Sequence, residues 1–443
     1  MKNNIVFILF LFGLMSCETS SNKSKKNISG EADFSKFIAI GESYSAGNVK
    51  TPDQQKESPM AILAGQFAKV GGGEFKIPLN AYSEDVSNGG PYQNLAVPST
   101  SSYHVIDKAF SSKSTYFKNL SSKDDNSILD EVLAQKDRTF FSIWIGGNDL
   151  VQYSSQGGLG VVRKADDPIS SYNPIVTQPD GSKLTTRDLT APETFDKIYS
   201  ELVDKFMEGG SQGILASLSN VIDLPFFTAI PSQSITLTQK EADQLNLTYK
   251  AYNKSLERIA NPAPELKTEI EKRKIVFKAG DHNGAVIIDE DLTALDKLPK
   301  YRQANSEDII LLTAKNGMTD ASVKLGTKNP MDDQYVLIPS EIKNINDVTR
   351  AYNNTIKRIA DEKKLAYVNL DSIMNQLKSP EGLVHEGVKY TSQLTGGFFS
   401  MDALPNGRGN AFMCNEFIKA INIRYKTKIP LVNPNSYQGN PNF

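Results

Sequence analysis

The chain has 443 residues, of which 39% are hydrophobic and 23% charged, a composition ordinary for a globular protein. The formal net charge is −2, and neither a basic stripe nor an RNA-binding aromatic motif is present. Such a chain has no field that attracts nucleic acid, so we expect no nucleic-acid partner. The length exceeds one average domain, but α/β chains of this size can fold as one elaborated unit.

The first residues have the features of an export signal. An apolar run over residues 5–15 follows a lysine, and it is too short to span a bilayer. Residues 14–17 read Leu-Met-Ser-Cys, which resembles a bacterial lipobox. We therefore expect residues 1–16 to be removed and Cys17 to be acylated, which would anchor the protein to a membrane. A plain secretory signal with a chance cysteine is the alternative.

Residues 17–33 are rich in Ser, Asn and Lys and predict a flexible tether ahead of a single domain at 34–430. A Pro/Asn-rich tail follows at 431–443. The second cysteine, Cys414, falls in a helical pattern and is expected to be a small core residue. Two cysteines and three scattered histidines do not make a zinc site, so we expect no metal and no cofactor.

Apolar runs and amphipathic segments alternate along the mature chain. In order, they predict strand 37–40, helix 58–70, strand 93–98, helix 126–135, strand 139–145, helix 192–208, strand 213–218, helix 245–260, strand 285–288, helix 345–360, strand 365–369 and helix 411–425. Such alternation is typical of an α/β fold, in which helices cover both faces of a parallel sheet.

The second half contains an interruption and an internal similarity. Residues 261–340 are expected to form an insertion on the basic sheet. The helices predicted at 245–260 and 345–360 share Ala-Tyr-Asn and Arg-Ile-Ala at an offset of 100 residues. A duplicated helix–strand unit would explain this similarity, and so would two helices under similar packing demands.

Polar loops follow three of the predicted strands, and a fourth loop at Asp402 precedes the last helix. The carboxyl ends of parallel strands share one edge of the sheet, where ligands bind. Acyl transfer needs a nucleophile at such an edge, together with donors aimed at the developing oxyanion. Ser43 is the candidate nucleophile. The candidate donors are a backbone N–H, either that of the residue after Ser99 or that of Ser99 itself, and the side-chain amide of Asn148. Each loop alone would more often be an ordinary turn.

This ordered set resembles the SGNH, or GDSL-type, hydrolases, and in particular the large outer-membrane lipoproteins of that family. The similar blocks are Gly-Glu-Ser at 41–43, Asn-Leu-Ala-Val-Pro-Ser at 94–99, Gly-Gly-Asn-Asp at 146–149 and the stretch 398–422. The resemblance implies an SGNH-hydrolase-like, flavodoxin-like fold and hydrolysis of acyl or acetyl esters. It also implies catalytic roles for Ser43 and Asp402, and an oxyanion hole made by Ser43, Ser99 and Asn148.

The chain departs from the family pattern at three places. Glu42 replaces an aspartate, Ser99 replaces the oxyanion glycine, and Leu404 runs directly into proline where the family has a histidine. Without this base the serine hydroxyl is a poor nucleophile, so we expect hydrolysis to be weak or absent. Three substitutes remain open: His104 or His385 reaching Ser43, or Asp402 acting as a direct base. The third histidine, His282, lies in a turn of the insertion.

Two functions therefore remain open. The first is a weakly active or inactive esterase-like lipoprotein acting through Ser43 on an ester or glycan ligand. The second is a non-catalytic binding or assembly module in an envelope protein complex. In either case the resemblance and Cys17 imply a lipid-anchored protein of the outer membrane, on its periplasmic face or at the cell surface.

Overall fold

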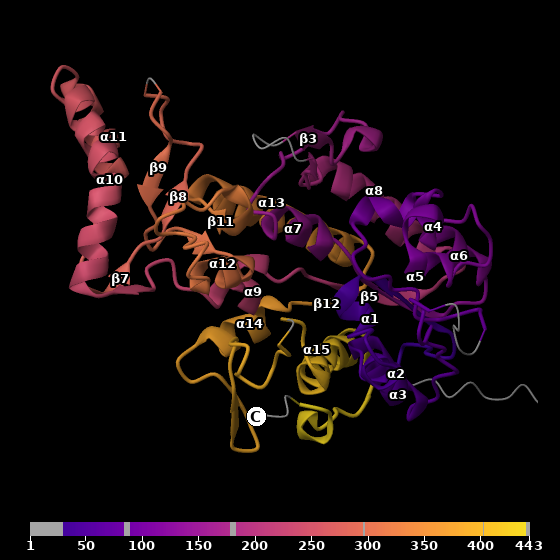
Figure 1. Cartoon of the computed structure of the whole chain (residues 1–443). Helices are drawn as coiled ribbons and strands as arrows, with labels where there is room; N and C mark the ends of the chain where they lie inside the picture. The colour runs from indigo at the N-terminus through magenta and orange to yellow at the C-terminus, as the bar shows by residue number, and fades with distance from the viewer. Residues whose placement is uncertain (1–29, 84–88, 178–182, 296, 402, 440–443) are drawn as a thin grey trace, which may run out of the picture.

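The computed structural model describes residues 30–83, 89–177, 183–295, 297–401 and 403–439 (Figure 1). The predictions made for the signal peptide, for Cys17 and for Asp402 therefore lie outside the described residues. Within the described part of the chain, no helix is both long enough and apolar enough to cross a membrane.

Four parallel strands form the central sheet, in the order β1 (Phe37–Gly41), β2 (Phe140–Trp144), β5 (Gln212–Ala216) and β12 (Ala366–Val368). The segment 93–97 extends the sheet beside β1, where the Leu95 N–H donates to the Ala39 carbonyl at 2.8 Å. Counting this segment as the second strand gives the order 2-1-3-4-5, which is the flavodoxin-like doubly wound order. The expected fold class is confirmed.

Helices cover both faces of the sheet, as Figure 1 shows. On one face α3 (Pro59–Ala68) packs against α15 (Gly407–Tyr425), and on the other α8 (Pro192–Met207) packs against α13 (Pro339–Glu362). Every residue of β1 and β2 is buried, which explains why these strands are continuous apolar runs rather than alternating ones. Cys414 is buried on α15, as expected for a core residue.

Shorter elements connect these layers. They are α1 (Ser43–Ala46), α2 (Pro52–Lys56), α4 (Phe110–Lys113), α5 (Thr115–Lys118), α6 (Ile128–Ala134), α7 (Gly147–Ser154) and α14 (Asp371–Lys378), with the antiparallel pairs β3 (Ile175–Thr177) with β4 (Lys183–Thr185) and β13 (Leu383–His385) with β14 (Val388–Tyr390). Several of them carry the loops at the carboxyl edge of the sheet, where the candidate site lies.

A separate lobe, defined as residues 225–338, lies between β5 and α13 and stands to the left in Figure 1. Its own hydrophobic clusters are distinct from the main core. Its elements are α9 (Pro225–Thr228), β6 (Ile235–Leu237), α10 (Gln239–Ala260), α11 (Lys267–Arg273), β7 (Gly280–Asn283), β8 (Val286–Ile288), β9 (Tyr301–Gln303), β10 (Ile309–Ile310), α12 (Lys315–Thr319) and β11 (Val336–Leu337). Because α10 packs on α11 and β6, the lobe extends before the expected boundary at residue 261.

The two similar helices use one asparagine in the same way. On α10, the Asn253 amide accepts from the Ile275 N–H at 3.1 Å and donates to the Ile275 carbonyl at 2.7 Å. On α13, the Asn353 amide accepts from the Leu218 N–H at 2.7 Å and donates to the Leu218 carbonyl at 2.8 Å. The shared Ala-Tyr-Asn therefore fixes each helix to an extended segment. Both explanations of the similarity fit this contact.

Both ends of the described chain pack against α15. The Glu31 N–H donates to the Tyr425 carbonyl at 2.8 Å, and Ala32 is buried in the main core. Near the other end, the Asn415 side chain exchanges two hydrogen bonds of 2.9 Å with the backbone of Val432. The last residues of the expected tether and the first of the expected tail thus belong to the folded unit.

Candidate active site

Ser43 lies at the carboxyl end of β1, as the first residue of α1. The strand ends at Gly41, where an added Cβ would lie 2.2 Å from the Ser45 hydroxyl and 2.5 Å from the Trp144 carbonyl. Only glycine fits this close approach between β1, β2 and α1. The sharp passage from strand to helix places the Ser43 side chain at the edge of the sheet.

Ser99 is brought next to Ser43 from the loop after the 93–97 segment. Its backbone N–H donates to the Ser43 Oγ at 3.3 Å. Ser99 has a φ of +61°, a left-handed conformation that costs a residue with a Cβ about 1–2 kcal/mol. The resemblance expects glycine at this position, and the backbone indeed has a glycine-like conformation. The serine therefore keeps the N–H directed at Ser43.

Asn148 supplies a second candidate donor. It lies in the first turn of α7, directly after β2, and its side chain is buried. Its buried Nδ2 has no partner within hydrogen-bond distance among the described residues, although the Asn148 side chain lies close enough to the Glu42 carboxyl to lower the pKa of that group. An unsatisfied buried polar group costs about 1–3 kcal/mol, so this amide is available to a ligand oxygen. Ser43, Ser99 and Asn148, the three residues expected to form the oxyanion hole, thus lie at one edge of the sheet.

Glu42 joins the two strand ends that carry Ser43 and Asn148. Its carboxylate accepts from the Asn148 N–H at 2.6 Å, and a Cβ on Gly147 would lie 2.2 Å from its Oε1. Burial raises the pKa of Glu42 to about 8, an effect that the hydrogen bond from Asn148 partly offsets and the nearby Asp149 increases. Glu42 is therefore mainly protonated at neutral pH.

The raised pKa of Glu42 predicts a loss of stability with rising pH. Between its ordinary value of 4.5 and about 8 the unfolded chain releases this proton and the folded chain retains it. The stability that Glu42 contributes to the folded state is therefore fully present below pH 4.5 and is lost as pH rises from 4.5 to about 8. In urea unfolding from pH 5 to 8, wild type should lose up to about 1.4 kcal/mol per pH unit relative to Glu42→Gln. A constant difference between the two proteins would contradict the assignment.

Asp149 fixes the Ser99 loop to α7, a role that the sequence reasoning missed. Its carboxylate accepts from the Ser102 N–H at 2.7 Å, the Ser102 hydroxyl at 2.8 Å and the Thr190 hydroxyl at 2.5 Å. Burial raises the pKa of Asp149, while these hydrogen bonds lower it. The sequence shows an aspartate directly after Asn148, but its partners lie 47 and 41 residues away along the chain.

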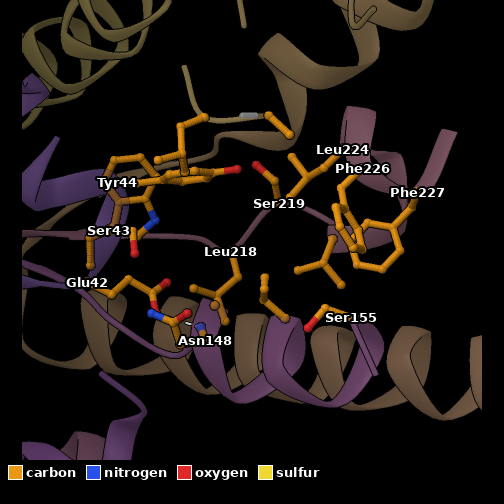
Figure 2. A pocket seen from close by; sticks show the side chains of 16 residues that line it. Glu42, Ser43, Tyr44, Asn148, Ser155, Leu218, Ser219, Leu224, Phe226 and Phe227 are labelled. Atoms are coloured by element: carbon orange, nitrogen blue, oxygen red, sulfur yellow. Dashed lines mark hydrogen bonds between the residues drawn. The ribbon is translucent and has the colours of Figure 1, made fainter. Parts of the chain in front are cut away.

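Glu42, Ser43 and Asn148 line a pocket with a cavity volume of about 220 Å³ (Figure 2). Glu42, Ser43 and Asn148 lie at one end of the view, and Phe226 and Phe227 lie at the other. The pocket is lined by Glu42, Ser43, Tyr44, Trp144, Gly147, Asn148, Val151, Ser155, Leu218, Ser219, Val221, Leu224, Phe226, Phe227, Ala403 and Leu404. It is polar beside Ser43 and mainly apolar beyond it.

A tight turn forms the wall where the resemblance expects the histidine. Phe399 pairs with Pro405 in an antiparallel bridge, and the Ser400 N–H donates to the Leu404 carbonyl at 2.8 Å. Ala403 closes the turn with a φ of +63°. Leu404 lines the pocket, so an apolar side chain occupies the wall from which a base would act.

The three histidines make their contacts elsewhere. The His104 Nδ1 accepts from the Ser101 N–H at 3.1 Å, its ring stacks on Phe110, and burial lowers its pKa to about 4. His385 lies 3.3 Å from the Asn433 side chain, and His282 is exposed beside Asp281. None of the three lines the pocket or bonds to Ser43 in the described part of the chain. The structure does not bring His104 or His385 to Ser43.

No family model matches the chain, and no curated protein sequence matches it. Among solved structures it is similar to TesA, with 9% identity over 88% of this chain and 99% of that one, and a TM-score of 0.31. It is also similar to the psychrotrophic esterase EstA from Pseudoalteromonas sp., with 9% identity over 88% of this chain and 97% of that one, and a TM-score of 0.30. An extracellular lipase of Streptomyces rimosus matches with 10% identity over 87% of this chain and 99% of that one, and a TM-score of 0.31. These TM-scores are too low to define a function.

Proposed function

We propose that this chain is an SGNH-type, ester hydrolase-like lipoprotein that has kept the nucleophile position and the oxyanion donors but has lost the base. The observation that carries this proposal is that the Ser99 N–H donates to the Ser43 hydroxyl, while Ser43 and the buried Asn148 side chain line one pocket that has no histidine among its described lining residues. The lipobox at Cys17 supports a lipid anchor in the outer membrane.

The geometry supports binding of an acyl group more strongly than its turnover. A carbonyl oxygen beside Ser43 would accept hydrogen bonds from the Ser99 N–H and from Asn148, which favours developing negative charge. No described group in the pocket is placed to remove the Ser43 proton, and loss of one triad member typically costs several orders of magnitude in rate. Hydrolysis through Ser43 is therefore slow at best.

A non-catalytic assembly module is the second candidate. It is favoured by Leu404 in the wall of the pocket and by exposed apolar side chains on the lobe, where Leu247 is 68% exposed and Val276 is 50% exposed. Such exposed apolar side chains are compatible with a protein partner in an envelope complex.

A comparison of wild type with Ser43→Ala tests the proposal. With p-nitrophenyl butyrate at pH 7.5, we expect the two proteins to hydrolyse the ester at rates within about tenfold of each other, because the base is missing. The matched control is Ser112→Ala, an exposed serine of α4. Rapid turnover that Ser43→Ala abolishes would show a complete active site and overturn the proposal.

A further inference from the structure

We propose that this pocket recognises the medium-length alkyl chain of an acyl group and discriminates against acetyl. This inference rests on the proposed function, because it places the acyl carbonyl beside Ser43. The sequence did not indicate whether the acyl group is acetyl or longer. The residues that line the pocket favour a longer group.

The apolar residues of the pocket form a continuous path away from Ser43. Leu218 lies between Ser43 and the far end in Figure 2, and Leu224, Phe226 and Phe227 close that end. An acetyl methyl beside Ser43 would leave these side chains in contact with water. An alkyl chain would cover them, and each buried methylene raises affinity roughly fourfold.

The charge of the pocket also favours an uncharged chain. Its described lining residues include no lysine, arginine or histidine that would pair with a phosphate or sulfate group. Among these described residues the ionisable side chains are Glu42 and Tyr44, and burial raises the pKa of both, so that both are mainly neutral near pH 7. The donors expected to bind an oxyanion lie at the Ser43 end, and the other polar lining residues, Ser155 and Ser219, carry uncharged hydroxyls, so the lining suits a molecule with one carbonyl or carboxylate head.

The far wall is built by elements that follow β5 and lead into the lobe. A short 3-10 helix (Val221–Asp223) and α9 present Leu224 and Phe227, which are buried. The start of this wall is fixed, because Asn353 of α13 holds both backbone groups of Leu218. The alkyl site is therefore a formed cavity between the main body of the protein and α9, the first helix of the lobe.

Binding of sodium acetate, butyrate, octanoate and dodecanoate tests the proposal without requiring turnover. Trp144 is the single tryptophan of the chain and lines the pocket, so its fluorescence reports occupancy. At pH 6.5 we expect octanoate to bind at least tenfold more tightly than butyrate, and acetate to give no saturable change. Equal affinities across the series, or tightest binding of acetate, would overturn the proposal.

A pair of variants localises the alkyl chain. Ser155 lines the pocket near Phe226 and Phe227, so Ser155→Phe should fill the apolar end and weaken octanoate binding at least tenfold. Ser112→Phe, on the exposed face of α4, is the matched control and should leave binding unchanged. Octanoate binding that survives Ser155→Phe would contradict the assignment. If Ser155→Phe does not fold, the binding of the four carboxylates to wild type still tests the proposal.

The failures of this inference and of the proposed function are distinguishable. If Ser43-dependent hydrolysis of an acetyl ester appears on adding imidazole while octanoate does not bind, the chain-length inference fails and the proposed function stands. If Ser155→Phe weakens octanoate binding but added imidazole gives no Ser43-dependent hydrolysis of any ester, the alkyl site stands and the proposed function fails.

Discussion

Replacement of Arg302 by alanine is expected to lower the free energy of unfolding by about 3–5 kcal/mol. Arg302 is buried on β9 in the lobe, and its guanidinium donates to both carboxylate oxygens of Asp308, at 2.6 and 2.7 Å, and also to Asp289. The two carboxylates raise the pKa of Arg302, since they stabilise its charged form. Its removal would leave two buried carboxylates without a counter-charge, which is the costly outcome.

Urea unfolding followed by far-ultraviolet circular dichroism measures this loss, because that signal includes the helices of the lobe. The control is Lys343→Ala, which removes a pair with Asp347 on the exposed side of α13. Exposed pairs contribute about 1 kcal/mol or less, so this variant should stay close to wild type. Similar small effects in both variants would mean that the buried network contributes little to the fold.

Insertion of a histidine between Leu404 and Pro405 should increase ester hydrolysis by about 100-fold or more, the usual range for a positioned general base. The insertion lengthens the turn that joins Phe399 to Pro405 and introduces an imidazole on the pocket wall beside Leu404. In the proposed function the nucleophile and the two donors are already in place, and the base is the missing group. The measurement is kcat/KM for p-nitrophenyl butyrate.

Two control proteins test whether a gain in hydrolysis comes from the inserted imidazole and from Ser43. An alanine inserted at the same place lengthens the turn without adding a base and should leave the rate unchanged. Ser43→Ala combined with the histidine insertion should return the rate to the wild-type level. If the histidine insertion gives no activity although the protein is folded, the site has diverged at more than this one position.

The fold could be predicted because its strands are buried on both faces. Such strands consist of consecutive apolar residues, and the apolar runs at 37–40 and 139–145 correspond to β1 and β2 in the structure. The strand expected at 285–288 was found as β8, but it pairs with β9 in the lobe and not with the main sheet. Strand pairing depends on contacts distant in sequence, which local patterns do not contain.

The candidate site could be predicted only in part. Ser43, Ser99 and Asn148 follow strands that share one edge, so the order of the strands brings them together. The apolar wall formed by Leu224 and Phe227 was not predicted, because its position depends on how the chain leaves β5. The roles of Asp402 and Cys17 stay predictions, since both residues lie outside the described structure.

Rescue by added imidazole tests the central claim most directly, because it supplies a base without changing the fold. The measurement is the rate of p-nitrophenyl butyrate hydrolysis by wild type, corrected for Ser43→Ala and for imidazole alone. We predict a corrected rate near zero without imidazole that rises with imidazole concentration, as expected if Ser43, Ser99 and Asn148 need only a proton acceptor. A high corrected rate without imidazole, or equal rates for the two proteins at every concentration, would contradict the claim.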